Sequence, residues 1–335
     1  LLFGFAISNE INKVEIAILD HAKDATTIEI IHKMASSKYF SINRYLNAES
    51  QVEGIFKQGK IKAVINFEKD FGANLIKEGQ STIQVIADAT DPNTANSITN
   101  YIQAIIQQYN QAININQLES NQVIMQTHMA FNPEIKSVFM FVPGVMTIIL
   151  MLVSAMMTSI SITKEKELGT MEILLVSPLK PFQVVLGKVV PYILLSIINA
   201  IIIVLLSIFI FKMPVQGSFF LLAAESVLFI ITALSLGILI STIAETQQTA
   251  MMISLMGLML PVILLSGFIF PITSMPLPLQ LISNIIPAKW FILIIKGIML
   301  KGVGIAFIWK ETLILFGMTL FFMGVSIYKY KIRLE

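Results

Sequence analysis

Hydrophobic and polar positions divide the chain into two parts that suit different solvents. From residue 10 to about 133, short apolar runs alternate with polar stretches, as in a domain that is dissolved in water. From Ser137 onward the apolar runs lengthen to about 20 residues, the length of a helix that crosses a bilayer core. The pattern therefore predicts a soluble domain over 10–133 and a transmembrane domain over 134–335.

The first part predicts an α/β domain, because short strand-like runs alternate with runs at helical spacing. The predicted strands cover 14–20, 39–45, 60–68 and 81–90, and the predicted helices cover 25–35, 48–59 and 71–79. The turn DPNT at 91–94 opens a longer polar helix. The Gln/Asn-rich tract 107–126 is expected to continue it as a solvated stalk helix, since Ile, Tyr and Leu are spaced along it.

The second part predicts an α-helical membrane protein. Only helices can cross singly, because lipid offers no partner to a free backbone N–H or C=O. The expected spans lie near 137–162, 189–211, 218–243, 250–270 and 307–328. The Pro-rich stretch 271–301 reads as an outer re-entrant hairpin, with an ordinary sixth crossing as the alternative. The opening residues 1–9 are expected to be the remnant of a truncated first helix, which would make six helices with an inserted extracytoplasmic α/β domain.

The distribution of basic residues predicts the orientation. Lys329, Lys331 and Arg333 lie near the C-terminus, and several lysines lie in the segment between the first two full spans. Basic residues prefer the cytoplasmic side, so both places are expected there. The bias is mild, because lysines such as Lys212 occur on the opposite side. Five full spans then put the α/β domain outside the cytoplasm and the C-terminus inside.

Composition excludes several classes of function. Of the residues, 55% are hydrophobic and 13% charged, against about 25% charged in soluble domains. The net charge of +2 gives no reason to expect a nucleic acid partner. The chain has no cysteine and no HExxH motif, which argues against disulfides and metal sites of those kinds. The spans contain no His or Asp and the chain no GxSxG, so a membrane enzyme is disfavoured.

One charged segment between two uncharged spans needs a specific explanation. It begins KEKE at 164–167, and Gly169 is expected to break the preceding helix. Thr170 could cap a short new helix that runs to Pro178. That helix would be apolar nearly all round, so it must be buried. The residues alone leave two sites open, the lipid headgroups and a groove of a partner protein.

The sequence KEKELGTMEILLVSPLKPFQVVLGKVVPY resembles the membrane subunits of ABC-2 type transporters. The positions that match the family pattern are Glu165, Lys166, Glu167, Gly169, Thr170, Glu172, Leu174, Leu175, Val176, Ser177, Pro178, Leu179, Leu186, Gly187 and Lys188. Residues 241–252 and 264–291 agree with the same family. DATDPNTA at 88–95 is similar to the branch with a large extracytoplasmic domain, which includes multidrug exporter permeases.

The resemblance implies a type V exporter fold in which 164–178 is a coupling helix seated on a cytoplasmic ABC ATPase subunit. The implied coupling residues are Glu165, Lys166, Glu167, Gly169, Thr170, Glu172, Leu175, Pro178, Gly187 and Lys188. The chain lacks G-x-x-x-x-G-K-[ST], so ATP and Mg would be bound by the partner and no cofactor by this chain. Further expected partners are a second permease copy or paralogue, membrane lipid and a periplasmic adaptor. The expected function is export of a drug-like or lipid-like cargo across the bacterial cytoplasmic (inner) membrane.

Glu225 is a candidate for a cargo or proton site, because it lies inside the third full span. A structural hydrogen-bonding role is the preferred interpretation, since water could reach that depth. Two alternative functions stay open from the sequence. A membrane-anchored receptor or sensor would explain the soluble domain, and a proton-coupled transporter would use Glu225. Copurification with an ATPase would separate both from an ABC permease.

Overall fold

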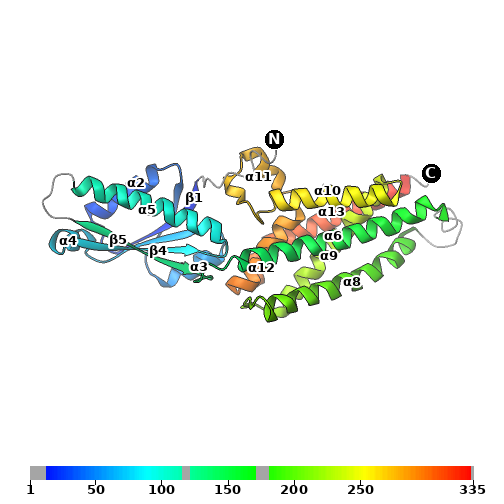
Figure 1. Ribbon diagram of the computed structural model, residues 1–335, viewed down its shortest axis with the longest axis horizontal. Coiled ribbons are helices and arrows are strands. Elements are labelled where there is room, and N and C mark those ends of the chain that lie inside the picture. Colours follow the sequence, from blue (N-terminus) through cyan, green and yellow to red (C-terminus); the bar gives the residue numbers. More distant parts are fainter. Residues whose placement is uncertain (1–12, 115–120, 171–180, 333–335) are drawn as a thin grey trace. The chain divides into compact units, whose positions relative to one another are not determined.

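The computed structural model describes residues 13–114, 121–170 and 181–332 (Figure 1). The chain forms two compact units, and the boundary between them lies between Met140 and Phe141. The first unit contains the strands and the second the long apolar helices. The two units therefore correspond to the two solvent preferences in the sequence.

A mixed sheet forms the centre of the first unit. Its described strands are β1 (Val14–Asp20), β2 (Phe40–Leu46), β3 (Ala63–Phe67), β4 (Gln80–Asp88) and β5 (Gln122–Ala130). Their order is β2-β1-β3-β4-β5, and only the β3–β4 pair is antiparallel. All residues of β3 are buried, as expected for a central strand whose two faces are both covered.

Helices cover both faces of this sheet. One face is packed by α2 (Ala25–Ser36), α4 (Phe71–Lys77) and α5 (Pro92–Asn114), which bury the larger apolar core. The other face is packed by α3 (Ser50–Lys57), which buries a smaller core against β1 and β3. Inward residues of β1 alternate between the two cores, with Ile16 in the larger and Ala17 in the smaller. The expected α/β architecture is therefore present.

The stalk-helix prediction is wrong for the later part of the tract 107–126. The helix α5 ends at Asn114, and β5 begins at Gln122 and pairs in parallel with β4. Two asparagines of α5 stabilise this arrangement through the backbone of β5 and the residue before it. Asn110 accepts from Val123 N at 2.9 Å and donates to Val123 O at 3.0 Å. Asn114 exchanges the equivalent pair with Asn121, at 3.0 and 2.9 Å.

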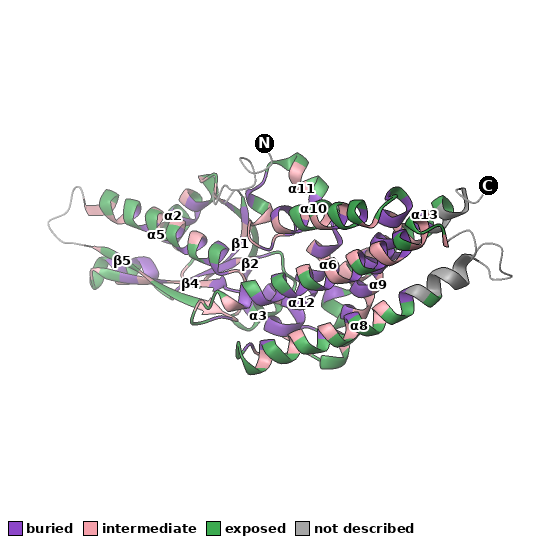
Figure 2. Cartoon of the chain, turned by 45° about the vertical axis from the view of Figure 1, so that its right-hand side comes forward, coloured by how far each residue is buried: buried purple, intermediate pink, exposed green. Residues whose placement is uncertain are grey.

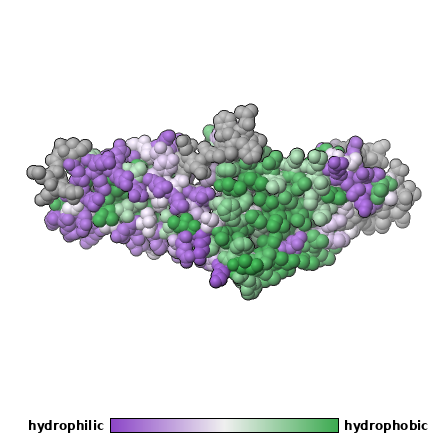
Figure 3. Space-filling model, viewed as in Figure 1, coloured by the Kyte–Doolittle hydropathy of each residue, from purple (hydrophilic) through white to green (hydrophobic). Residues whose placement is uncertain are grey.

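The second unit is helical. Five of its described helices are long and apolar enough to cross a membrane: α6 (Val138–Glu167), α8 (Pro181–Phe209), α9 (Phe219–Ile243), α10 (Gln247–Leu265) and α13 (Ile305–Ile332). These helices coincide with the five spans expected from the sequence. Hydrophobic side chains cover most of the visible surface of this unit, whereas hydrophilic ones prevail on the α/β unit (Figure 3).

The stretch between α10 and α13 is bent. It contains a short 3-10 turn, η1 (Ile272–Ser274), followed by α11 (Leu277–Ser283) and α12 (Pro287–Lys301). The axes of α11 and α12 differ by 78°. Taken together, the two helices are long and apolar enough to cross a membrane. The described chain therefore has five candidate spans, or six if this bent pair is one broken span. The re-entrant hairpin over 271–301 stays a prediction.

The helix α9 is the centre of the helical unit. In the most hydrophobic 18-residue stretch of α9, 72% is buried inside the protein (Figure 2). The corresponding share is 17% for α8 and 28% for α10. The ring of Phe229 on α9 stacks on Phe291 of α12, with centroids 4.0 Å apart. Polar side chains bridge α9 and α13, with Thr232 Oγ1 and Thr319 Oγ1 2.6 Å apart. Such hydrogen bonds between membrane helices help fix which faces pack together.

Candidate functional site

The charged segment that the sequence analysis singled out lies at the end of α6. The helix ends at Glu167, and Gly169 follows with a φ of +71°, in the left-handed region. Its N–H donates to Lys166 O at 3.2 Å, which closes the last turn. Glycine adopts this conformation without the strain that a Cβ adds, so Gly169 allows the chain to leave the helix in a left-handed turn.

Lys166 contacts the end of a different helix. Its Nζ donates a hydrogen bond to the backbone carbonyl of Ser241, which lies in the last turn of α9. Carbonyls in the last turn of a helix have no partner within that helix. The ammonium group therefore satisfies an otherwise unpaired acceptor, and its positive charge lies at the negative end of the α9 dipole.

Glu167 contacts the start of the next helix. Its Oε2 accepts from the backbone N–H of Gln247 at 2.8 Å and from the Gln247 side chain at 3.1 Å. Gln247 is the first residue of α10, so this N–H has no partner within the helix. Thr246 caps the same end by accepting from Thr249 N at 3.2 Å. A carboxylate at this place also interacts favourably with the positive end of the α10 dipole.

A third contact holds the residues after α6. The hydroxyl of Thr170 donates to Oε2 of Glu165, and both side chains are partly buried. Gly187 lies in α8 and is exposed, and Lys188 follows it in the same helix. Other predicted coupling residues lie outside the described residues: Glu172, Leu175 and Pro178.

The structure thus brings Lys166 and Glu167 onto the turn between α9 and α10, contacts that the sequence analysis did not predict. The two contacts span 75 and 80 residues of sequence. The only sequence signal for them is the polar break AETQQT at 244–249, which separates two apolar runs. The sequence shows that this break lies between two spans, but it does not show that the end of α6 contacts it.

Glu225 lies in the second turn of α9 and is buried, with 3% of its surface exposed. Its Oε1 accepts from the Thr312 hydroxyl of α13 at 2.7 Å, whereas its Oε2 has no hydrogen-bond partner among the described residues. The bond to Thr312 agrees with the structural interpretation of Glu225. A cargo or proton role for this carboxyl stays a prediction.

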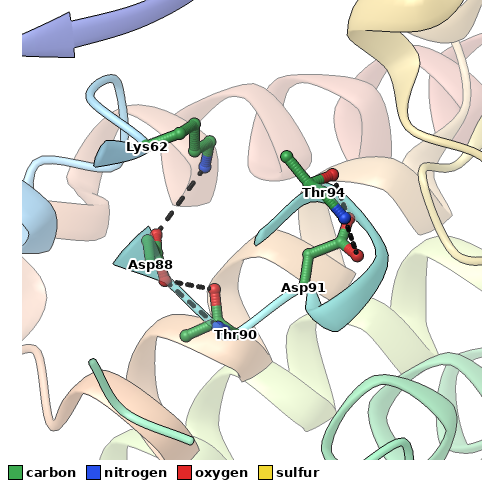
Figure 4. A network of polar contacts seen from close by, with 5 residues as sticks. All are labelled: Lys62, Asp88, Thr90, Asp91 and Thr94. Carbon is green, nitrogen blue, oxygen red and sulfur yellow. Dashed lines mark hydrogen bonds and ion pairs between the residues drawn. The ribbon is translucent and has the colours of Figure 1, made fainter. Parts of the chain in front are cut away.

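The motif DATDPNTA links β4 to α5 (Figure 4). Asp88 is buried and accepts from Thr90 N at 3.2 Å and Thr90 Oγ1 at 2.7 Å, while Lys62 Nζ lies 3.9 Å from its other oxygen. Asp91 precedes Pro92, the first residue of α5, and accepts from Thr94 N at 3.3 Å and Thr94 Oγ1 at 3.0 Å. Asp before Pro is a favourable helix start, so these residues position α5 on the sheet.

The described parts of the chain contain neither a metal-binding cluster nor a phosphate-binding loop. No group of three or more His, Asp or Glu side chains in 13–114, 121–170 and 181–332 could hold a metal ion. The stretch GIFKQGK at 54–60 has the glycine and lysine spacing of a phosphate loop. However, Gly54 lies inside α3 and Ile61 replaces the required Ser or Thr, so the stretch does not form such a loop.

Comparisons with known proteins find several transporter permeases that are similar to this chain. The chain is 32% identical over 337 residues to "Probable multidrug ABC transporter permease YbhS" of Escherichia coli (strain K12), covering 100% of this chain and 89% of that protein. It is 29% identical over 311 residues to "Probable multidrug ABC transporter permease YbhR" of the same strain, covering 93% and 84%. It is 25% identical over 346 residues to "Inner membrane transport permease YhhJ" of that strain, covering 99% and 91%.

A family model described as "ABC-2 family transporter protein" matches residues 1–328. The resemblance seen in the charged segment is therefore confirmed over nearly the whole chain. Permeases of ABC transporters work with an ATPase subunit, and the printed sequence contains no complete phosphate loop of its own. This multi-pass membrane protein belongs to the ABC-2 family of transporter proteins.

Proposed function

We propose that this chain is the permease subunit of an ATP-driven ABC exporter, which moves a hydrophobic or amphipathic cargo out across the bacterial inner membrane. The observation that carries the proposal is the charged end of α6, whose side chains are attached to α9 and α10. This end of α6 is the start of 164–178, the part of the sequence that resembles the family's coupling helix. A force on the described end of α6 would therefore reach α9 and α10 as well as α6.

The proposed orientation puts the end of α6 and the C-terminus in the cytoplasm and the α/β unit outside. Two lysines in the last turn of α6, Lys164 and Lys166, support this orientation, as do the basic residues near the C-terminus. One relative is named an inner membrane permease, which supports the same membrane for this chain.

The proposed partners follow from the same arrangement. A cytoplasmic ABC ATPase binds the segment after Gly169 and supplies the site for ATP and Mg. A second copy or a paralogue of the permease completes the path for the cargo, and a periplasmic adaptor is a further proposed partner. The cargo class rests on two relatives whose names contain "multidrug" and on the apolar surface of the helices (Figure 3).

Copurification and dye efflux together test this function. The tagged chain is expressed with candidate ABC ATPase subunits from the same genome, and we expect one of them to copurify in a stable complex. Cells that express the complex should export ethidium, a lipophilic cation, more quickly than cells with an ATPase that cannot hydrolyse ATP. Efflux that stops with a protonophore at constant ATP and does not need the ATPase would instead show a proton-coupled transporter. Absence of both copurification and efflux would favour a receptor.

A further inference from the structure

We propose that Lys166 and Glu167 form a clamp, which ties the end of α6 to the α9–α10 turn and transmits movement of the coupling segment to α10. This inference rests on the proposed function, because it assigns the route by which an ATPase would act on the membrane helices. It makes the two residues positioning residues whose charges serve contacts within this chain.

The two side chains suit their targets in direction and in sign. Successive residues of an α-helix point about 100° apart, so neighbours can reach two different helices. Lys166 donates to a carbonyl in the last turn of α9, and Glu167 accepts from the first N–H of α10. A cation is favourable at a helix C-terminus and an anion at an N-terminus. Exchanging the two residues would put each charge at the wrong helix end.

The turn that the clamp holds is short. Only residues 244–246 separate α9 from α10, and Ala244 is completely buried. The end of α9 is therefore connected tightly to the start of α10, and a displacement of one is transmitted to the other. The clamp contacts both sides of this turn, so it acts on the turn as a whole.

The neighbouring contacts show which helix the clamp directs. The helices α6 and α9 already approach closely at Gly237, because a Cβ there would lie 2.4 Å from Ala155 O. In contrast, one hydrogen bond among the described residues joins α10 to α6 within the spans, between the hydroxyls of Ser159 and Ser254, 3.0 Å apart. The most hydrophobic 18-residue stretch of α10 is also only 28% buried. A pull at Glu167 therefore displaces α10 more easily than α9.

The first experiment tests the tie in the permease alone, without any ATPase. The natural sequence has no cysteine, so a pair of introduced cysteines gives an unambiguous cross-link. We expect Glu167→Cys with Gln247→Cys to be joined rapidly by a short bis-methanethiosulfonate reagent in membranes. The control pair, Lys164→Cys with Gln247→Cys, should react several-fold more slowly, because Lys164 lies almost one turn earlier. Equal rates for the two pairs would overturn the clamp.

The second experiment tests transmission in the complex. The exposed Gln248 in the first turn of α10 is replaced by cysteine as a reporter, and its rate of maleimide labelling is measured with and without ATP plus vanadate. Glu167→Ala should reduce this nucleotide-dependent change by about fivefold or more, the lower end of coupling between linked sites. Recovery of the ATPase in a pull-down should stay near that of the wild type. Lys164→Ala, which removes a charge from the same turn, should leave the change intact.

An exchange variant separates the clamp from a simple charge effect. Lys166→Glu/Glu167→Lys keeps the composition and net charge of the segment but reverses the charges at the two helix ends. The clamp predicts that the nucleotide-dependent change is lost, whereas lipid attraction or a charged rim predicts no loss. A response equal to the wild type in Glu167→Ala or in the exchange variant would overturn the proposal. A wild-type chain that binds no ATPase would overturn the proposed function, while the cross-link still reports whether the tie exists.

Discussion

Replacement of Gly237 by alanine tests the close packing that holds α6 against α9. An added Cβ would lie 2.4 Å from Ala155 O and 3.0 Å from Ala155 Cα, and both are backbone atoms. The helices must therefore move apart, because no side chain can turn aside to relieve the contact. Overpacking of this kind usually costs about 1–3 kcal/mol. Alanine in a helix regains up to ~1 kcal/mol over glycine, so we expect a net loss of stability.

The matched control is Gly257→Ala on α10. The nearest atom to a Cβ there is Ile253 Cγ2 at 3.8 Å, an ordinary contact. This variant gains the same helix propensity without the clash, so its stability should be unchanged or raised.

The assay is thermal unfolding of the purified protein in detergent, followed by intrinsic fluorescence and size-exclusion recovery. For a unit of this size, each kcal/mol changes Tm by about 2–4 °C. We therefore expect Gly237→Ala to unfold several degrees below Gly257→Ala. Equal Tm values for the two variants would show that α6 and α9 do not pack backbone to backbone at this point.

Three further predictions concern orientation, pH dependence and the buried carboxyl. A cysteine at the exposed Asn93 should react with a membrane-impermeant maleimide in intact spheroplasts, because the α/β unit is proposed to face outward; labelling only after lysis would reverse the orientation. Burial, followed by the charges of Glu29 and Asp24, raises the pKa of Tyr109 from 10.0 to about 12. The folded form binds the phenol proton more tightly than the unfolded form does. Protonated Tyr109 therefore contributes fully to the free energy of unfolding below pH ~10, and this contribution is lost as the pH rises towards 12. Alkaline unfolding of an isolated 7–140 fragment should therefore show a weaker pH dependence in Tyr109→Phe, and an identical pH dependence would contradict the assignment. Glu225→Gln keeps an acceptor for the Thr312 hydroxyl, so assembly and dye efflux should stay within about twofold of the wild type; loss of efflux with normal assembly would favour a cargo or proton role.

The parts of the fold that the sequence predicts are those with strong local patterns. The strands β1 and β3 are short apolar runs bounded by polar residues, and all five residues of β3 are buried. The long apolar runs after Ser137 likewise predict helices, because length and composition are sufficient for a candidate span. In both cases the signal lies within the element itself, so no knowledge of its neighbours is needed.

The strand β5 shows where local patterns are insufficient. It contains Gln122, Gln126 and His128, and its composition resembles the polar tract before it. It becomes a strand because β4 offers a parallel edge and because asparagines of α5 bind the backbone near its start. Strand propensity depends strongly on such neighbours. Val123 is the only buried residue of β5, so the strand lacks the alternating apolar pattern that would have revealed it in the sequence.

The adjacent opposite charges of Lys166 and Glu167 match contacts that become visible only when three helices are considered together. A solvated helix end needs no particular order of lysine and glutamate, so the sequence alone permits any arrangement of these charges. In the structure, consecutive positions face opposite ends of two consecutive helices, the carbonyl end of α9 and the amide end of α10. Two helices that follow one another across a short turn always present these opposite ends side by side. A neighbouring helix that binds both ends therefore needs one cation and one anion at adjacent positions, and Lys166 and Glu167 meet that requirement.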